Sequence, residues 1–261
     1  MVTDLFGLLG QLGVIIFAYV TVIFAIAVWR KDNGIMDVAW GLGFVIIAGY
    51  TLFTTGEFHV RQILVTLLTV IWGSRLSLHI YVRNRRKSSE DFRYRNWRER
   101  WGRWVYLRSY LQVFLLQGFL MIVFTVPVIF INKFSGPGLI VADYVGMIIW
   151  FTGFLLESVA DFQLLRFKSN SENQGEIMTR GLWQYSRHPN YFGESLLWWG
   201  IWGMALSVNG GLYTVVSPVL LTFFLLRISG VPMLEDKYKG NPDYREYRER
   251  TNTFIPWFPK G

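Results

Sequence analysis

The chain has 261 residues, of which 52% are hydrophobic and 18% aromatic, and its mean hydropathy is +0.30. A water-soluble domain of this length does not need several apolar runs that approach the length of a bilayer span, so the composition indicates a polytopic membrane protein. The absence of cysteine excludes disulfides, thiolate metal ligands and a cysteine nucleophile, and we expect no metal site.

Seven apolar runs approach the roughly 20 residues that cross a bilayer as a helix. In chain order they are residues 5–29, 35–55, 63–82, 110–131, 139–162, 191–208 and 212–233. The first run is too long for a removable signal peptide and lacks a basic start and a small-residue cleavage site. We therefore expect an all-α fold with seven transmembrane helices.

Lysine and arginine collect on one side of this predicted topology. Of the 26 basic residues, only Arg61 and Lys133 fall in the loops on the other side, and Arg75 and Arg227 lie within apolar runs. The positive-inside rule makes the basic side cytoplasmic, with the N-terminus outside and the tail from residue 234 inside. The net charge of +8 follows from this asymmetry, which argues against a nucleic-acid partner.

The connections on the basic side are long and rich in Arg, Glu, Asn and Tyr; they are residues 83–109, 166–190 and 234–261. The loops on the other side are short, so we expect the functional site on the basic side. The sequence contains neither a GxGxxG fingerprint nor a Walker sequence, so any nucleotide must be held without a Rossmann unit.

Ionisable residues within the apolar runs are expensive, because a charged side chain in hydrocarbon costs roughly 2.5 kcal/mol or more. In the predicted topology only Asp143 lies near the outer end of a run. The others fall in the inner half or at the inner boundary: Asp37, Arg75, His79, Glu157, Asp161, Glu194, Arg227 and Glu235. This distribution predicts a pocket that is open to the cytoplasm and closed toward the outside.

The spacing of these residues places several of them on shared helix faces. Glu157 and Asp161 are four residues apart, and two carboxylates on one face require nearby cations or hydrogen-bond donors. Arg75 and His79 have the same spacing. A salt-bridge network that holds the helices in register is a structural alternative, and it is compatible with binding; its members would be Arg75, Arg227, Glu157, Asp161 and Glu194.

The stretch GLWQYSRHPNYFGE stands at the start of the sixth apolar run. Its Arg187, His188, Asn190 and Glu194 offer a cation, an imidazole, an amide and a carboxylate, and Pro189 fixes the backbone where a helix can begin. Asn190 and Glu194 are one helical turn apart and share a face. A helix entrance with interfacial aromatic residues is the simpler interpretation; these are Trp183, Tyr185 and Tyr191.

This stretch resembles the C-terminal signature of the steroid 5α-reductase family, in which Asn is followed after two residues by Gly-Glu. The chain as a whole looks like a compact bacterial-type member, which implies a bacterial inner membrane with the cofactor site on the cytoplasmic side. A looser RHPNY resemblance extends to sterol reductases of the C14 and Δ7 type and to isoprenylcysteine carboxyl methyltransferases. The motif alone therefore implies an integral membrane enzyme that acts on a lipid.

The family resemblance implies that residues 1–132 hold the lipid substrate and that residues 133–261 bind NADPH. Several arginines suit a 2′-phosphate and a pyrophosphate, and Asn, Asp and Glu suit adenine and ribose. The implied cofactor contacts are Arg75, Arg83, Arg86, Glu157, Asp161, Lys168, Arg180, Tyr185, Arg187, His188, Asn190, Glu194, Arg227 and Glu235.

The resemblance also implies a catalytic pair. Asp37 matches the position of the family's catalytic glutamate, and Trp72 or a neighbour falls near the catalytic tyrosine when Arg75 is used as the anchor. Trp72 is a departure, because an indole N–H donates a hydrogen bond but is no proton acid at neutral pH. Other candidate donors are Tyr81, Tyr50, His79 and a protonated Asp37. A helix cap is the structural alternative for Asp37.

The expected activity is NADPH-dependent reduction of the Δ4 double bond of a 3-oxo steroid taken from the bilayer. A membrane methyltransferase that uses S-adenosylmethionine is one alternative, with the RHPNY segment and Glu235 beside its cofactor, but it would not need the basic groups for a 2′-phosphate. A non-catalytic membrane scaffold is the other. The oligomeric state stays open.

Overall fold

The computed structural model describes residues 2–55, 57–85, 90 and 92–260. This part of the chain is 80% helical and contains no strand, as the apolar runs predict. It forms two compact units, Met1–Leu139 and Ile140–Gly261. The boundary between the units lies at residue 139, whereas the sequence placed a division after residue 132.

Within the described residues, six helical segments rather than seven are long and apolar enough to cross a membrane. They are Leu5–Arg30, Ile35–Thr54, Val60–Arg85, Arg93–Phe124, Val141–Ser169 and Gly211–Lys237. These segments support an integral membrane protein. The sixth predicted run forms α9, Pro189–Ala205, whose 17 residues span about 25 Å and fall short of a bilayer core of about 30 Å.

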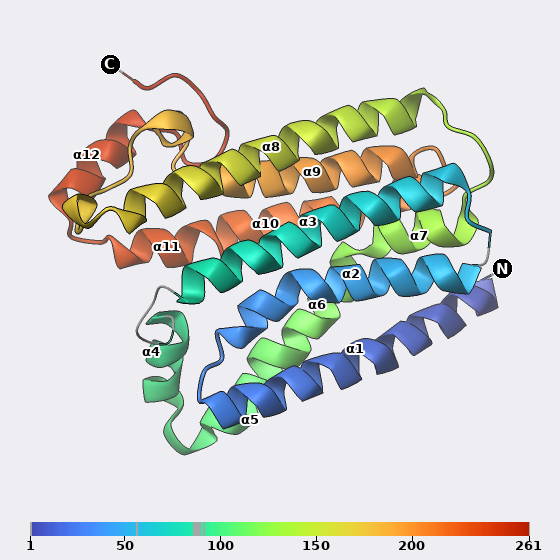
Figure 1. The fold of residues 1–261 in the computed structure, drawn as a ribbon, viewed down its shortest axis with the longest axis horizontal. Helices are drawn as coiled ribbons and strands as arrows, with labels where there is room; N and C mark the ends of the chain where they lie inside the picture. The colour runs from blue at the N-terminus through green and yellow to red at the C-terminus, as the bar shows by residue number, and fades with distance from the viewer. Residues whose placement is uncertain (1, 56, 86–89, 91, 261) are drawn as a thin grey trace. The chain divides into compact units, whose positions relative to one another are not determined.

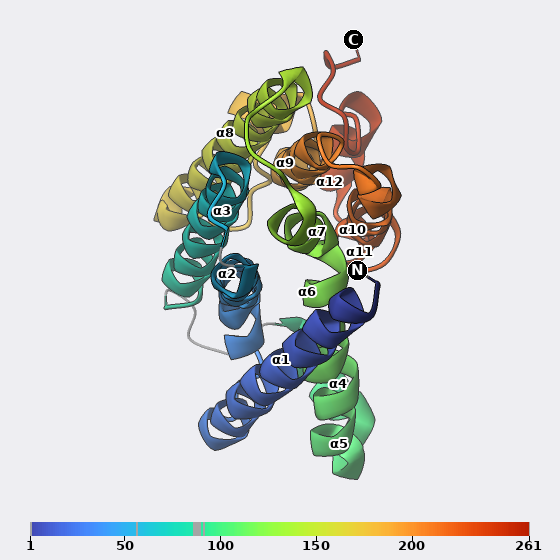
Figure 2. The same cartoon turned by 90° about the vertical axis from the view of Figure 1, so that its right-hand side faces the viewer.

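Unit 1 begins with three long helices, α1 (Val2–Arg30), α2 (Ile35–Thr55) and α3 (Val60–Arg85). The basic connection that follows is largely helical, and it contains α4 (Phe92–Trp101), η1 (Gly102–Trp104) and α5 (Val105–Ser109). Both views show α4 and α5 at the same end of this unit (Figures 1 and 2).

The fourth predicted run is divided into η2, a π-helical stretch (Tyr110–Leu115), α6 (Leu116–Phe124) and α7 (Val126–Phe134). The break follows from Pro127, which has no backbone N–H for the helical ladder. Beside it, the buried Thr125 hydroxyl donates to the Met121 carbonyl at 2.6 Å. Such local changes of helix type have an identifiable cause and bend the segment.

Unit 2 begins with α8 (Val141–Ser169), followed by the short helices η3 (Ser171–Asn173) and η4 (Gly181–Gln184). After α9 come η5 (Gly211–Val215), α10 (Val216–Arg227), α11 (Val231–Lys237) and α12 (Pro242–Arg250). Figure 1 shows α8 and α9 side by side over most of their length.

Glycines allow α8 and α9 to meet backbone to backbone. A Cβ added at Gly153 would lie 2.5 Å from the Leu197 nitrogen, and one added at Gly200 would lie 2.6 Å from the Gly146 carbonyl oxygen. Real Cβ atoms do not approach so closely, so both positions need glycine. Small residues at such an interface are the usual means of close helix packing in membranes. This packing aligns the carboxylates of α8 with the polar start of α9.

Candidate functional site

The residues before α9 are attached to α8 through hydrogen bonds. Gly181 has a φ of +63°, and an added Cβ there would lie 2.6 Å from the Gln163 side chain. The Leu182 amide donates to Gln163 Oε1 at 2.9 Å, and the Trp183 indole donates to the Ala160 carbonyl at 3.1 Å. Pro189 then occupies the first turn of α9. These contacts fix the backbone that presents Arg187, His188 and Asn190.

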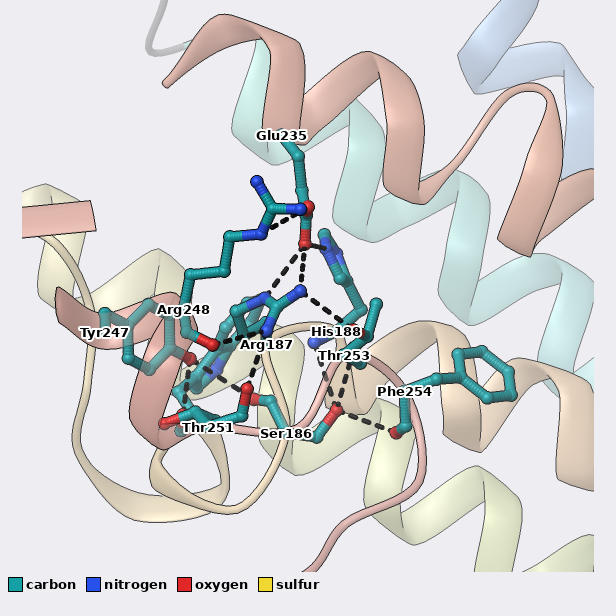
Figure 3. A network of polar contacts seen from close by, with 10 residues as sticks. Ser186, Arg187, His188, Glu235, Tyr247, Arg248, Thr251, Thr253 and Phe254 are labelled. Atoms are coloured by element: carbon teal, nitrogen blue, oxygen red, sulfur yellow. Dashed lines mark hydrogen bonds and ion pairs between the residues drawn. The ribbon is translucent and has the colours of Figure 1, made fainter. Parts of the chain in front are cut away.

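Arg187 is the centre of a polar network at the entrance of α9 (Figure 3). Its Nε donates to Glu235 Oε1 at 2.9 Å, and Nη2 lies 2.8 Å from the same oxygen. Nη1 donates to the carbonyls of Arg248 at 3.1 Å and Thr251 at 2.6 Å, and Nη2 donates to Thr253 Oγ1 at 2.8 Å. The five N–H groups of this buried guanidinium are therefore all engaged within unit 2.

The tail that follows α12 runs along the RHPNY region. The Arg187 amide donates to the Asn252 carbonyl at 2.8 Å, and the Trp257 amide donates to the Tyr185 carbonyl at 2.9 Å. The Ser186 hydroxyl donates to the Phe254 carbonyl at 2.7 Å. The tail therefore completes the backbone hydrogen bonding of the segment that enters α9.

Tyr247 of α12 contacts the same segment. Its hydroxyl donates to the carbonyls of Trp183 and Ser186, and the ring is buried. Burial raises the pKa of Tyr247 well above its ordinary value, so the phenol stays a neutral donor. The sequence did not indicate this role for Tyr247, because its acceptors are backbone carbonyls, which leave no pattern in the side chains.

His188 and Asn190 each carry a buried polar atom that lacks a hydrogen-bond partner among the described residues. The His188 ring stacks on Tyr191 with centroids 5.6 Å apart, and its Nε2 lies 3.5 Å from Glu235 Oε1, but Nδ1 has no partner there. The Asn190 amide nitrogen donates to Asp161 Oδ1 at 3.1 Å, while its Oδ1 has none. Buried polar atoms of this kind are available to a ligand.

The remaining predicted cofactor residues of unit 2 fall into two groups. Glu157 and Asp161 are buried on α8, and Glu194 is half-buried on α9, close to where Gly193 meets the Glu157 backbone. Tyr185 is half-buried with its ring 6.1 Å from Phe258. The others lie at exposed positions: Lys168, Arg180 and Arg227.

In unit 1, Asp37 is the centre of a second polar cluster. Arg93 Nη2 donates to Asp37 Oδ2 at 2.6 Å, and the Tyr94 hydroxyl donates to Asp37 Oδ1 at 2.5 Å. Both carboxylate oxygens thus accept from side chains of α4, which differs from the helix-cap interpretation. The sequence missed Tyr94, because it lies in a connection expected to be a loop. The recurrence of Tyr94, Trp97 and Trp101 at helical spacing is the signal that would have indicated its helix.

The other predicted residues of unit 1 have different surroundings. Trp72 is fully buried and packs edge-to-face on Phe44, with ring centroids 5.1 Å apart. Arg75 is half-buried on α3, and Arg83 Nε donates to Asn84 Oδ1 at 3.4 Å. Arg86 lies outside the described residues.

Two of the alternative donors that the sequence suggested, Tyr50 and Tyr81, contact residues other than the partners of Asp37. The Tyr50 hydroxyl donates to Gln11 Oε1 at 2.9 Å, and the ring of the exposed Tyr81 lies beneath the Arg85 guanidinium at 5.6 Å. His79 is half-buried on α3. Tyr94 is therefore the phenol that the structure brings to Asp37.

Two comparisons with known proteins match most of this chain. A family model described as "Protein of unknown function (DUF1295)" matches residues 23–251, which include both polar clusters apart from the last residues of the tail. An uncharacterized protein of Schizosaccharomyces pombe is 24% identical over 272 residues, covering 90% of this chain and 76% of that protein. No solved structure matches the chain.

Proposed function

Because the chain belongs to the DUF1295 family, which includes steroid 5α-reductase-like membrane proteins, we propose that it is a membrane-embedded enone reductase. The proposed substrate is a 3-oxo-Δ4 steroid or a similar lipid taken from the bilayer, and the proposed cofactor is NADPH. The proposed location is a bacterial inner membrane, with the cofactor site on the cytoplasmic side.

The observation that carries the proposal is the hydrogen bond between Tyr94 and Asp37. Tyr94 is 2% exposed, and its hydroxyl is already oriented by a carboxylate at 2.5 Å. A buried phenol can donate to a carbonyl oxygen and stabilise the negative charge that develops there. Tyr94 is thus a hydrogen-bond donor held beside Asp37, whereas the Trp72 ring packs against Phe44.

The polar start of α9 fits a dinucleotide in its donor and acceptor set. Asn190 Oδ1 can accept from a carboxamide or a ribose hydroxyl, and His188 Nδ1 is a second buried atom without a described partner. Asp161, Glu157 and Glu194 would supply further acceptors. The N–H donors of Arg187 are engaged within unit 2. The phosphates of NADPH would therefore be bound by the exposed cations Lys168, Arg180 and Arg227.

The chemistry assigned to the chain is polarisation of the enone. When bound, NADPH supplies a hydride to the β-carbon of the enone. The carbonyl oxygen competes with Asp37 for the Tyr94 proton and, as an enolate oxygen, keeps that hydrogen bond. Water then transfers a proton to the α-carbon of the enolate, which gives the saturated ketone and hydroxide. Arg93 holds the Asp37 carboxylate in place throughout.

The test measures cofactor retention and turnover on the same purified preparations. Tyr94→Phe and Asp37→Asn should retain NADPH and lower reduction of progesterone or testosterone by about 10²-fold or more. Tyr213→Phe, at an 83% exposed tyrosine, is the matched control and should keep full turnover. Retention of S-adenosylmethionine in place of NADPH would favour the methyltransferase alternative, and retention of neither would favour a scaffold.

A further inference from the structure

The short helix α4 has one buried face and one exposed face. Tyr94, Trp97, Arg98 and Trp101 recur at helical spacing and are buried or half-buried, with the rings of Trp97 and Trp101 stacked at 5.5 Å. The opposite face, which is exposed, consists of Arg95, Asn96, Glu99 and Arg100. An amphipathic pattern of this kind indicates a helix that lies on a surface.

Hydrogen bonds on the buried face hold α4 against the turn between α1 and α2. Arg98 contacts Glu90 through Nε at 3.2 Å and Nη2 at 2.9 Å, and the Asn33 amide donates to the same carboxylate at 2.9 Å. The Arg93–Asp37 pair adds a contact to α2. Figure 1 shows α4 at the end of unit 1 where α1 ends and α2 begins. The exposed face of α4 is therefore held in a defined orientation.

The exposed cationic surface continues beyond α4. Gly102, with a φ of +49°, turns the chain, and Arg103, Trp104, Tyr106 and Arg108 follow at exposed positions. The Arg103 guanidinium lies 5.4 Å from the Trp104 ring centroid. These residues form the first part of the candidate span Arg93–Phe124, and the apolar part of that segment follows them and runs to Phe124. This surface therefore adjoins the start of a hydrophobic helix.

Water alone does not explain the composition of this surface. Trp104, Tyr106 and Leu107 are each at least 50% exposed, although aromatic and aliphatic side chains favour a partly apolar environment. Trp and Tyr concentrate at membrane–water interfaces, and Arg can extend its charge to headgroups while its stem stays in apolar surroundings. No carboxylate partner is described for the exposed arginines of α4, η1 and α5, whereas Arg93 pairs with Asp37 and Arg98 pairs with Glu90.

We propose that this α4–α5 surface binds the headgroups of anionic phospholipids; its residues are Arg95, Arg100, Arg103, Trp104, Tyr106 and Arg108. Guanidinium groups form paired hydrogen bonds with phosphate oxygens, and the aromatic rings fit the interfacial layer above the acyl chains. An anionic lipid is the occupant because the surface carries four exposed arginines and a single exposed glutamate, Glu99. Lipid binding here would anchor the helix that supplies Arg93 and Tyr94.

The test uses the absence of native cysteine. Asn96→Cys introduces one thiol on the exposed face of α4, and a donor dye on it reports lipids that carry an acceptor. In phosphatidylcholine vesicles, energy transfer to trace labelled phosphatidylglycerol should exceed transfer to equally labelled phosphatidylcholine. Arg100→Gln with Arg103→Gln should lower this preference by up to about fivefold per charge at low salt. The preference should also fall in 1 M salt, where screening acts within about 3 Å.

Two matched variants give the test its controls. Arg245→Gln with Arg250→Gln removes the same charge from exposed positions on α12 and should leave the preference unchanged. Arg100→Lys with Arg103→Lys keeps the charge and should keep most of the preference, which shows that any loss in the Gln variant is not a folding defect. Two results would overturn the proposal. One is equal energy transfer to both lipids when the α4–α5 arginines are unchanged, and the other is a loss of lipid preference in the α12 control as large as in the Arg100→Gln, Arg103→Gln variant.

Discussion

Replacement of Arg187 by alanine tests whether the entrance of α9 holds the tail of unit 2. The change removes every donor that the guanidinium supplies to Glu235, Thr253 and the carbonyls of Arg248 and Thr251. Removing one partner of a buried ion pair costs about 3–5 kcal/mol, and each buried acceptor left unsatisfied costs about 1–3 kcal/mol. Since the Glu235 side chain is 16% exposed, water can replace part of this loss, and we expect about 3–5 kcal/mol in total.

Hydrogen exchange of backbone amides is the appropriate measurement, because it reports local opening as well as global unfolding. The amides of Trp257 and Lys260, which donate to Tyr185 and Arg250, are the direct reporters. In detergent their exchange should accelerate by about 10²-fold or more in Arg187→Ala. Arg187→Lys keeps the charge but not the fork of five donors, so it should recover only part of the protection.

Arg245→Ala is the matched control, because Arg245 lies exposed on α12 within the same part of the chain. It should leave the exchange of both reporter amides unchanged. If Arg187→Ala exchanges like the unmodified protein, the network does not hold the tail. In that case a direct role for Arg187 in cofactor binding, as the family resemblance implies, becomes the better explanation.

Three further predictions concern unit 2. Gly153→Ala should lower the free energy of unfolding by about 1–3 kcal/mol, because its Cβ would lie 2.5 Å from the α9 backbone; Gly49→Ala, with open space, should not destabilise α2. Tyr247→Phe should lower the free energy of unfolding by about 1–3 kcal/mol, because the carbonyls of Trp183 and Ser186 lose a donor; thermal unfolding measures this change. Burial and Glu235 raise the pKa of Tyr244 to about 12, so its stabilising contribution is complete below about pH 10 and is lost between about pH 10 and 12; melting curves of Tyr244→Phe should show a weaker decline there.

The long helices could be predicted because hydropathy is a local property of the sequence. The run expected at residues 35–55 matches α2 at both ends, and the expected run at 63–82 lies within α3. The C-terminal end of the run expected at residues 191–208 was placed too late, because apolar residues continue beyond Ala205, where α9 ends. Helix α4 was missed altogether, since its charged residues mask the helical spacing of Tyr94 and Trp97.

The candidate site was less predictable, because its contacts join residues that are distant in sequence. Tyr94 is 57 residues from Asp37, and no local pattern connects the two. The sequence indicated Arg187 and Glu235 as polar residues near a ligand, but their direct contact spans 48 residues. Most other acceptors of Arg187 are backbone carbonyls, whose positions depend on the path of the tail rather than on residue type.

The dependence of Arg187 on the tail also imposes an order of events during synthesis. Its acceptor at Thr251 lies 64 residues later in the chain, which at 5–20 residues per second means a delay of about 3–13 s after Arg187 is polymerised. During this interval the guanidinium must be solvated by water or headgroups at the edge of the insertion machinery. Chains that stop between Glu235 and Thr251 would keep the ion pair of Arg187 but would lack its acceptors at Thr251 and Thr253. Such truncated chains should be preferred substrates for membrane-associated proteases that remove incompletely assembled proteins.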